Sequence, residues 1–204
     1  QGVTTRTKYL AFGGAYHGDT IGSLSVGAGG FGTDVFDPLR FPVVRAPGFD
    51  DPGCIGAAWE LVARHAHELA AVVVEPLVQG AAGMQLRPPH EFAARGAACA
   101  QHDVLLICDE VATGFGRTGT LFASEQCGLA PDLMALGKGI TGGYLPMSVT
   151  AASQPASRHV QRFTASPPGR RPRSRSTGRG SPRTAPRRGR CPSPGSGCGS
   201  AAPS

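Results

Sequence analysis

Apolar runs and amphipathic stretches alternate along the chain from about residue 4 to residue 152. Apolar positions recur at helical spacing in residues 57–69, where one face carries Ala58, Leu61, Val62, His65 and Leu69. Residues 91–102 show the same spacing, with an apolar face of Phe92, Ala93, Gly96, Ala97 and Ala100. Each stretch is followed by a continuous apolar run, at residues 71–74 and 104–108, and such short runs are typical of buried parallel strands. The pattern predicts βαβ units around a mostly parallel sheet, and therefore an α/β fold.

Two acidic residues, Asp109 and Glu110, stand at the carboxyl end of the second predicted strand. In open parallel sheets, ligands bind beyond the carboxyl ends of the strands, where loops and helix N-termini converge. A functional site is therefore expected at Asp109.

The composition changes after residue 152. All fourteen acidic residues precede Ser153, and with nine Lys and Arg they give residues 1–152 a net charge of −5. Residues 153–204 carry eleven Arg, no acid, and Phe163 as their only aromatic side chain. Such a segment cannot bury enough apolar area to offset chain entropy. We expect one partial domain at residues 1–152 and a disordered Arg/Pro/Ser/Gly-rich tail at residues 153–204.

The tail also contains no Lys, Ile or Leu, which is unusual for an evolved linker. A reading-frame shift in a GC-rich coding sequence is one hypothesis for it, and sequencing the underlying DNA would test this. A nucleic-acid-binding protein acting through the tail is the alternative function, because arginine segments contact phosphates without folding. The tail lacks interleaved aromatic residues and any known binding module, so this alternative ranks low.

Other classes of protein find little support in the sequence. No charged-then-apolar leader and no long apolar run is present, which predicts a cytoplasmic chain without a membrane span. The six cysteines form no zinc-binding pattern, so no metal site is expected. Cys99 and Cys108 lie in apolar segments and are predicted to be buried free thiols.

The most informative stretch is residues 108–119, Cys-Asp-Glu-Val-Ala-Thr-Gly-Phe-Gly-Arg-Thr-Gly, followed by Lys138 in the Gly-rich segment 136–143. Together they resemble the motif of class III aminotransferases, and the resemblance covers residues 3–150. It implies the large domain of pyridoxal-phosphate (PLP) fold type I. It also implies that Asp109 contacts the pyridine nitrogen of PLP. By the same resemblance Lys138 is the catalytic lysine, which bonds covalently to the cofactor and also contacts the substrate.

The chemistry of PLP explains why these residue types are needed. A protonated ring nitrogen makes the cofactor a stronger electron sink, and an anionic Asp109 would keep it protonated. Lys138 has to act as an amine nucleophile and later as a base. An isolated Asp after a strand is more often a helix cap, and an isolated Lys is usually solvated. The joint pattern, in a chain with only two lysines, favours the chemical interpretation.

Residues 15–20, Ala-Tyr-His-Gly-Asp-Thr, match the aromatic-His-Gly element of the same family. By this resemblance Tyr16 lies against one face of the cofactor, with its hydroxyl toward substrate, and Val111 presses on the opposite face. A core tyrosine is the competing interpretation of Tyr16. For His17 and Glu75 a structural role is at least as well supported as a catalytic one.

Two positions narrow the expected substrate. Ornithine and 4-aminobutyrate transaminases of this class typically carry Gln where this chain has Ala112, and Glu where it has Ala81. The loss of that Glu suggests an amino donor other than glutamate. Residues 16–26, 74–84 and 109–113 instead resemble the biotin-biosynthesis branch of the class. That branch transfers an amino group from S-adenosylmethionine to 8-amino-7-oxononanoate, giving 7,8-diaminononanoate. Another class III omega-aminotransferase remains the alternative.

The family resemblance implies a homodimer, with each site formed between two subunits. The family's phosphate-binding Gly-Ser turn, its substrate-carboxylate Arg and a phosphate-binding Thr are not recognisable in this sequence. The chain is therefore expected to be a fragment with little or no transaminase activity of its own.

Overall fold

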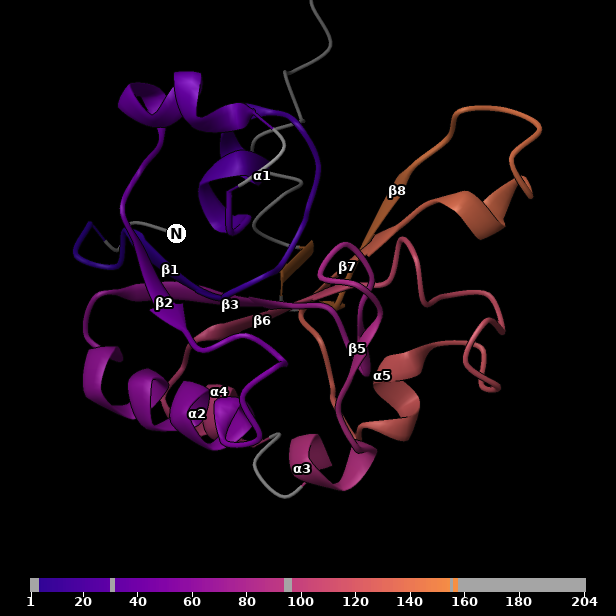
Figure 1. Ribbon diagram of the computed structural model, residues 1–204. Coiled ribbons are helices and arrows are strands. Elements are labelled where there is room, and N and C mark those ends of the chain that lie inside the picture. Colours follow the sequence, from indigo (N-terminus) through magenta and orange to yellow (C-terminus); the bar gives the residue numbers. More distant parts are fainter. Residues whose placement is uncertain (1–3, 30–31, 94–96, 155, 158–204) are drawn as a thin grey trace, which may run out of the picture. The chain divides into compact units, whose positions relative to one another are not determined.

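A computed structural model of the protein describes residues 4–29, 32–93, 97–154, 156 and 157. A six-stranded sheet forms its centre (Figure 1). In spatial order the strands are β2 (Val43–Ala46), β1 (Lys8–Phe12), β3 (Leu69–Val74), β6 (Leu105–Asp109), β7 (Leu133–Leu136) and β8 (Val149–Ala152). All neighbours pair in parallel except β8, which runs antiparallel to β7. The predicted α/β fold with a mostly parallel sheet is confirmed.

Helices cover both faces of this sheet (Figure 1). They are α1 (Ile21–Val26), α2 (Cys54–His65), α3 (Pro89–Ala93), α4 (Ala98–Gln101) and α5 (Ala123–Gln126), with 3₁₀ turns η1 (Thr33–Leu39) and η2 (Lys138–Ile140). A separate antiparallel pair joins β4 (Val78–Gln79) to β5 (Gln85–Leu86).

Alternation along the strands divides the core between the two faces. Leu10, Val72 and Leu106 pack with α2 and α4 in the larger apolar cluster. Ala11 and Val73 pack with Val26 of α1 and with the half-buried Ile107 in the smaller one. Side chains alternate between the two faces along a strand. Asp109 therefore faces the same side of the sheet as Ile107, which is the side that carries α1.

The structure corrects the predicted ends of the first helix. Leu69 was expected on its apolar face, but α2 ends at His65 and Leu69 begins β3. The chain enters the sheet here, because the Lys8 N–H donates to the Glu68 carbonyl at 3.0 Å and extends the β1 pairing. A buried Leu fits either a helix face or a strand, so apolar spacing alone could not separate the two.

The second predicted helix, residues 91–102, contains most of α3 and all of α4. Residues 94–96, between them, lie outside the described residues. The strand predicted at residues 104–108 is β6, and Asp109 is its last residue rather than the first one after it.

Cys99 and Cys108 are buried free thiols, as predicted, and so are Cys54 and Cys127. Burial raises the pKa of the Cys99 thiol, and that of Cys127, to about 12. These cysteines therefore remain neutral packing side chains. Within the described residues, no helix combines the length and apolar character needed to span a bilayer. The tail predicted from residue 153 lies outside the described residues, apart from 153, 154, 156 and 157.

Candidate active site

The carboxyl ends of the parallel strands β1, β3, β6 and β7 lead into loops that line one cavity of about 890 Å³. This volume lies within the range of small-molecule sites. All four residues singled out from the sequence line it, namely Tyr16, Asp109, Val111 and Lys138. His17 and Glu75, whose roles the sequence left open, line it as well. The structure thus brings together residues from four separate segments of the chain.

Asp109 is held by two neighbours at the end of β6. Its Oδ1 accepts the backbone N–H of Val111 at 3.1 Å, and its Oδ2 lies 2.7 Å from Nδ1 of His17. Both side chains are largely buried, with exposed fractions of 13% for Asp109 and 5% for His17. The carboxylate is therefore fixed in orientation, and the remaining lone pairs of its oxygens are available to a donor in the cavity.

The other ring nitrogen of His17, Nε2, is buried and has no hydrogen-bond partner among the described residues. Buried polar atoms are nearly always paired, with protein, water or a ligand. Sequence reasoning did not assign His17, because its contact with Asp109 joins positions 92 residues apart. Its place in the Tyr-His-Gly element was the only available signal.

Glu75 follows β3 and is buried, with 7% of its surface exposed. Its carboxyl oxygens accept the backbone N–H of Tyr16 and that of Gly80, each at 3.3 Å. Burial raises the pKa of Glu75, although the nearby His17 and these two N–H groups act in the opposite direction. Glu75 thus ties the loop after β1 to the loop after β3, which gives it a structural role.

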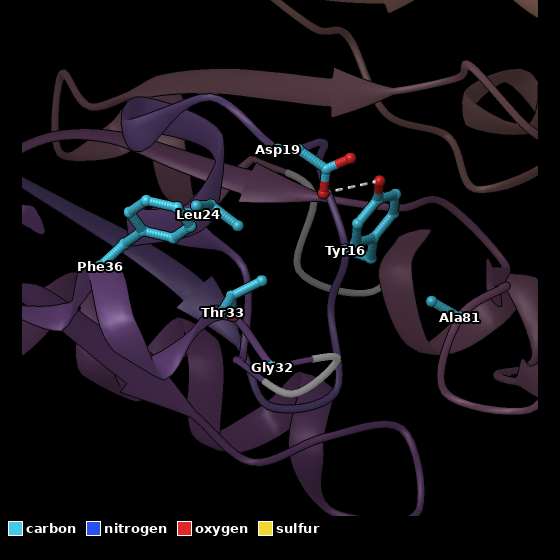
Figure 2. A pocket seen from close by; sticks show the side chains of 7 residues that line it. All are labelled: Tyr16, Asp19, Leu24, Gly32, Thr33, Phe36 and Ala81. Carbon is cyan, nitrogen blue, oxygen red and sulfur yellow. Dashed lines mark hydrogen bonds between the residues drawn. The ribbon is translucent and has the colours of Figure 1, made fainter.

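Tyr16 lines this cavity and also a smaller one of about 520 Å³, whose lining residues Figure 2 shows. The residue is 41% exposed, and its hydroxyl donates to Oδ1 of Asp19 at 3.1 Å. This hydrogen bond, followed by burial, raises the pKa of the Tyr16 phenol. In the smaller cavity Leu24 and Phe36 form an apolar side opposite Tyr16 and Asp19 (Figure 2). The core-tyrosine interpretation of Tyr16 is therefore wrong.

Lys138 is the first residue of η2, just after β7, and is exposed to the cavity. Its φ of 33° is positive, which is uncommon for a residue with a side chain. Strained backbone of this kind persists only where the surrounding structure enforces it, and it clusters at functional sites.

One wall of the cavity is braced by a carboxylate that sequence reasoning had not assigned. Glu110 is fully buried and accepts the backbone N–H of Ala123 (3.1 Å) and of Ser124 (2.7 Å) at the start of α5. It also accepts the Thr113 hydroxyl at 2.5 Å. Thr113, Arg117 and Thr118, on the turn so anchored, line the cavity and were likewise not singled out. Glu110 gave no local signal because its partners lie up to fourteen residues away.

The profile of the family Aminotransferase class-III matches residues 1–165. The chain belongs to the class III aminotransferases. The predicted family is confirmed, and with it the expected type of enzyme fold.

Relatives of this chain carry one recurrent name. This chain is 47% identical to adenosylmethionine-8-amino-7-oxononanoate aminotransferase of Nitratidesulfovibrio vulgaris, over 76% of its own length and 31% of that protein. The enzyme of that name from Geobacter sulfurreducens is 43% identical, over 76% of this chain and 37% of the relative. The chain therefore spans about a third of the length of these curated relatives.

Solved structures agree with this assignment. The crystal structure of adenosylmethionine-8-amino-7-oxononanoate aminotransferase from Methanocaldococcus jannaschii matches with a TM-score of 0.71 and 38% identity, over 77% of this chain and 37% of that one. An (S)-enantioselective omega-transaminase from Thermomicrobium roseum matches with a TM-score of 0.67 and 32% identity, over 79% and 39% of the two chains. Both are aminotransferases by name.

Proposed function

We propose that this chain forms the cofactor-binding core of a PLP-dependent aminotransferase. The observation that carries the proposal is the convergence of Asp109 and Lys138 on one cavity, from the ends of the adjacent strands β6 and β7. In an aminotransferase family, a partly buried carboxylate and an exposed amine that share one cavity suit the two ends of a pyridoxal ring system.

The residues present fit this cofactor. Asp109, already oriented by Val111 and His17, would hold the protonated ring nitrogen. Tyr16 and Val111 line the same cavity and would contact the two faces of the ring. When bound, PLP supplies the electron sink that makes removal of a proton from the substrate α-carbon feasible. The domain division at residue 152 belongs to the same proposal.

Lys138 is proposed as the catalytic residue. Its amine would hold the cofactor covalently, and once substrate has displaced it, the free amine would move a proton at the substrate α-carbon. The 41% exposure of Tyr16 and its hydrogen-bonded hydroxyl leave this residue able to contact substrate as well as cofactor. Tyr16 would thus contribute both to binding the cofactor and to orienting the substrate.

For the substrates we propose S-adenosylmethionine as amino donor and 8-amino-7-oxononanoate as acceptor, in biotin biosynthesis. Supporting this are the names of the relatives at 43–47% identity and the neutral Ala81 in the lining of both cavities. A cytoplasmic homodimer is part of the proposal for the whole protein. From the 204-residue chain itself we expect little or no turnover, because the family's substrate-carboxylate Arg and phosphate-binding turn are not recognisable in it.

Covalent labelling tests the cofactor assignment. The chain has only two lysines, and Lys8 lies on β1 with its ammonium 2.8 Å from the Glu68 carboxylate. After addition of PLP and borohydride reduction, peptide mass analysis should place the pyridoxyl group on Lys138. The Lys138→Arg variant should remain unlabelled, and Lys8→Arg should label like the parent. Labelling of Lys8 in preference to Lys138 would overturn the proposed function.

A further inference from the structure

Two glycines flank Lys138, and each lies against the turn that follows Asp109. A Cβ atom built on Gly137 would come within 3.1 Å of Val111 Cγ1. One built on Gly139 would come within 2.7 Å of both Cβ and Cδ2 of Phe115, a separation that real side chains do not adopt. Gly139 has no left-handed φ, so this contact, and not backbone conformation, excludes a larger residue there.

Phe115 is itself held in place from behind. Its φ is 61°, a left-handed conformation that a bulky residue adopts only under constraint. Its ring packs edge-on against Phe122, with centroids 5.9 Å apart and planes at 68°. Phe122 directly precedes α5, whose first two N–H groups donate to the buried carboxylate of Glu110. The bracing by Glu110 therefore extends through α5 and Phe122 to Phe115.

The turn before Phe115 is tied to the same carboxylate residue. The Gly114 N–H donates to the Glu110 carbonyl at 2.9 Å, and a Cβ on Gly114 would lie only 2.8 Å from that oxygen. After Phe115, the Gly116 N–H donates to the Leu121 carbonyl at 3.2 Å. Phe115 thus projects from a turn that is fixed on both sides.

The amine of Lys138, in contrast, is not restrained in this way, since within the described residues no hydrogen bond or ion pair involves its side chain. Its location depends on the backbone of η2, and that backbone meets Phe115 at Gly139. Small displacements at this contact would change where the four-carbon side chain of Lys138 reaches in the cavity.

We propose that Phe115 is a positioning residue which, packed on Gly139, sets the location of the Lys138 turn relative to the end of β6 at Asp109. This inference deepens the proposed function, on which its relevance to catalysis rests. The contact would keep the amine and the carboxylate at the separation that one cofactor molecule needs.

A cofactor-free experiment tests the positioning. Reductive methylation with ¹³C-formaldehyde places NMR-visible methyl groups on the two lysines, so that Lys8 serves as internal reference for Lys138. Gly139→Ala should shift the Lys138 methyl signal and leave that of Lys8 unchanged. Gly22→Ala is the matched control, because Gly22 has no atoms within 4 Å of a built Cβ and no left-handed φ.

A double-mutant comparison separates positioning from general damage to the fold. Phe115→Gly tolerates the left-handed φ and removes the atoms that a Cβ at position 139 would meet. In this background, Gly139→Ala should have no further effect on the Lys138 signal. A Gly139→Ala effect that is absent in the parent, or equal in both backgrounds, would overturn the inference.

The rate of pyridoxyl labelling provides the functional readout. Gly139→Ala should slow labelling of Lys138 by at least about fivefold, because a displaced amine reacts more slowly, with an unchanged far-ultraviolet circular dichroism spectrum. Suppose that the parent chain fails to label, while the Lys138 NMR signal shows that the effect of Gly139→Ala depends on Phe115. The proposed function is then wrong and the positioning role stands. If the parent labels at Lys138 but the effect of Gly139→Ala does not depend on Phe115, the proposed function stands and the positioning role is wrong.

Discussion

The Asp109 carboxylate is oriented by protein groups, since the Val111 N–H and the His17 imidazole each contact one of its oxygens. Asp109→Asn keeps the shape of the side chain and removes its charge. If Asp109 holds a protonated ring nitrogen, PLP should bind about 10- to 100-fold more weakly, as expected for loss of a charge-assisted hydrogen bond. An absorbance titration measures this, with Asp34→Asn in η1 as control. Affinity within about twofold of the parent would contradict the assigned role.

The buried Glu75 should make stability depend on pH. Its pKa is raised in the folded state, chiefly by burial, so the folded chain binds a proton more tightly than the unfolded chain does. The stability that Glu75 contributes is therefore fully present below the pKa of an ordinary glutamate and is lost as pH rises through the folded-state pKa. Relative to Glu75→Gln, the parent should lose free energy of unfolding as pH increases. Urea denaturation between about pH 4 and pH 8 measures this, and a difference that stays constant or grows with pH would contradict it.

At the scale of single residues, the sequence was informative where a candidate residue lies in a short local motif. Asp109 and Lys138 could be singled out as candidates because each lies in a motif that ends a predicted strand or fills a glycine-rich turn. The partners that orient them could not be found in this way. His17 reaches Asp109, and Glu110 reaches α5, through contacts that exist only once the loops have folded over the strand ends.

Among the elements, α5 depends most directly on a single side chain. It has only four residues, which is too short to be stable alone, and no side-chain cap at Phe122. Glu110 satisfies its first N–H groups from the end of β6. Glu110→Ala would leave these buried donors unpaired and should lower the free energy of unfolding by about 2–4 kcal/mol. Glu125→Ala, on the exposed side of the same helix, should change it by less than about 0.5 kcal/mol in the same urea experiment. Equal effects of the two substitutions would rule out the brace.

Predicting elements from sequence succeeded for buried strands and failed at boundaries. β3 is a continuous apolar run, and β6 is apolar up to Asp109. Both strands have neighbours on both sides, so a run of apolar residues in the sequence is enough to locate them. The end of α2 does not, because it is decided by the pairing of β1 beside Glu68, a contact between segments about sixty residues apart. Positions 111–119 form turns that hydrogen bonds to Glu110 hold in place, and no periodicity could have predicted them.

For the molecule as a whole, the order of strands explains why the site lies where it does. β3, β6 and β7 are adjacent and parallel, so their carboxyl ends deliver Glu75, Asp109 and Lys138 to the same edge of the sheet. The sequence predicted the parallel sheet and this edge, but it could not indicate the antiparallel strand β8 beside β7. That strand has no preceding amphipathic helix to mark it as part of a βαβ unit.

β8 is the last strand in the spatial order, and it is exposed at all four of its residues. The segment that leads into it is also apolar and exposed, with Tyr144 at 94%, Leu145 at 62% and Met147 at 50%. An exposed sheet edge beside apolar side chains favours pairing with another chain. The isolated 204-residue chain should therefore associate as its concentration rises. Ala151→Lys, which places a charge in the middle of β8, should shift the average mass in light scattering toward the monomer. Gln101→Lys adds the same charge at the exposed end of α4 and should not. If both variants associate like the parent, the contact lies elsewhere, and the edge of β8 is not the surface through which copies of this chain meet.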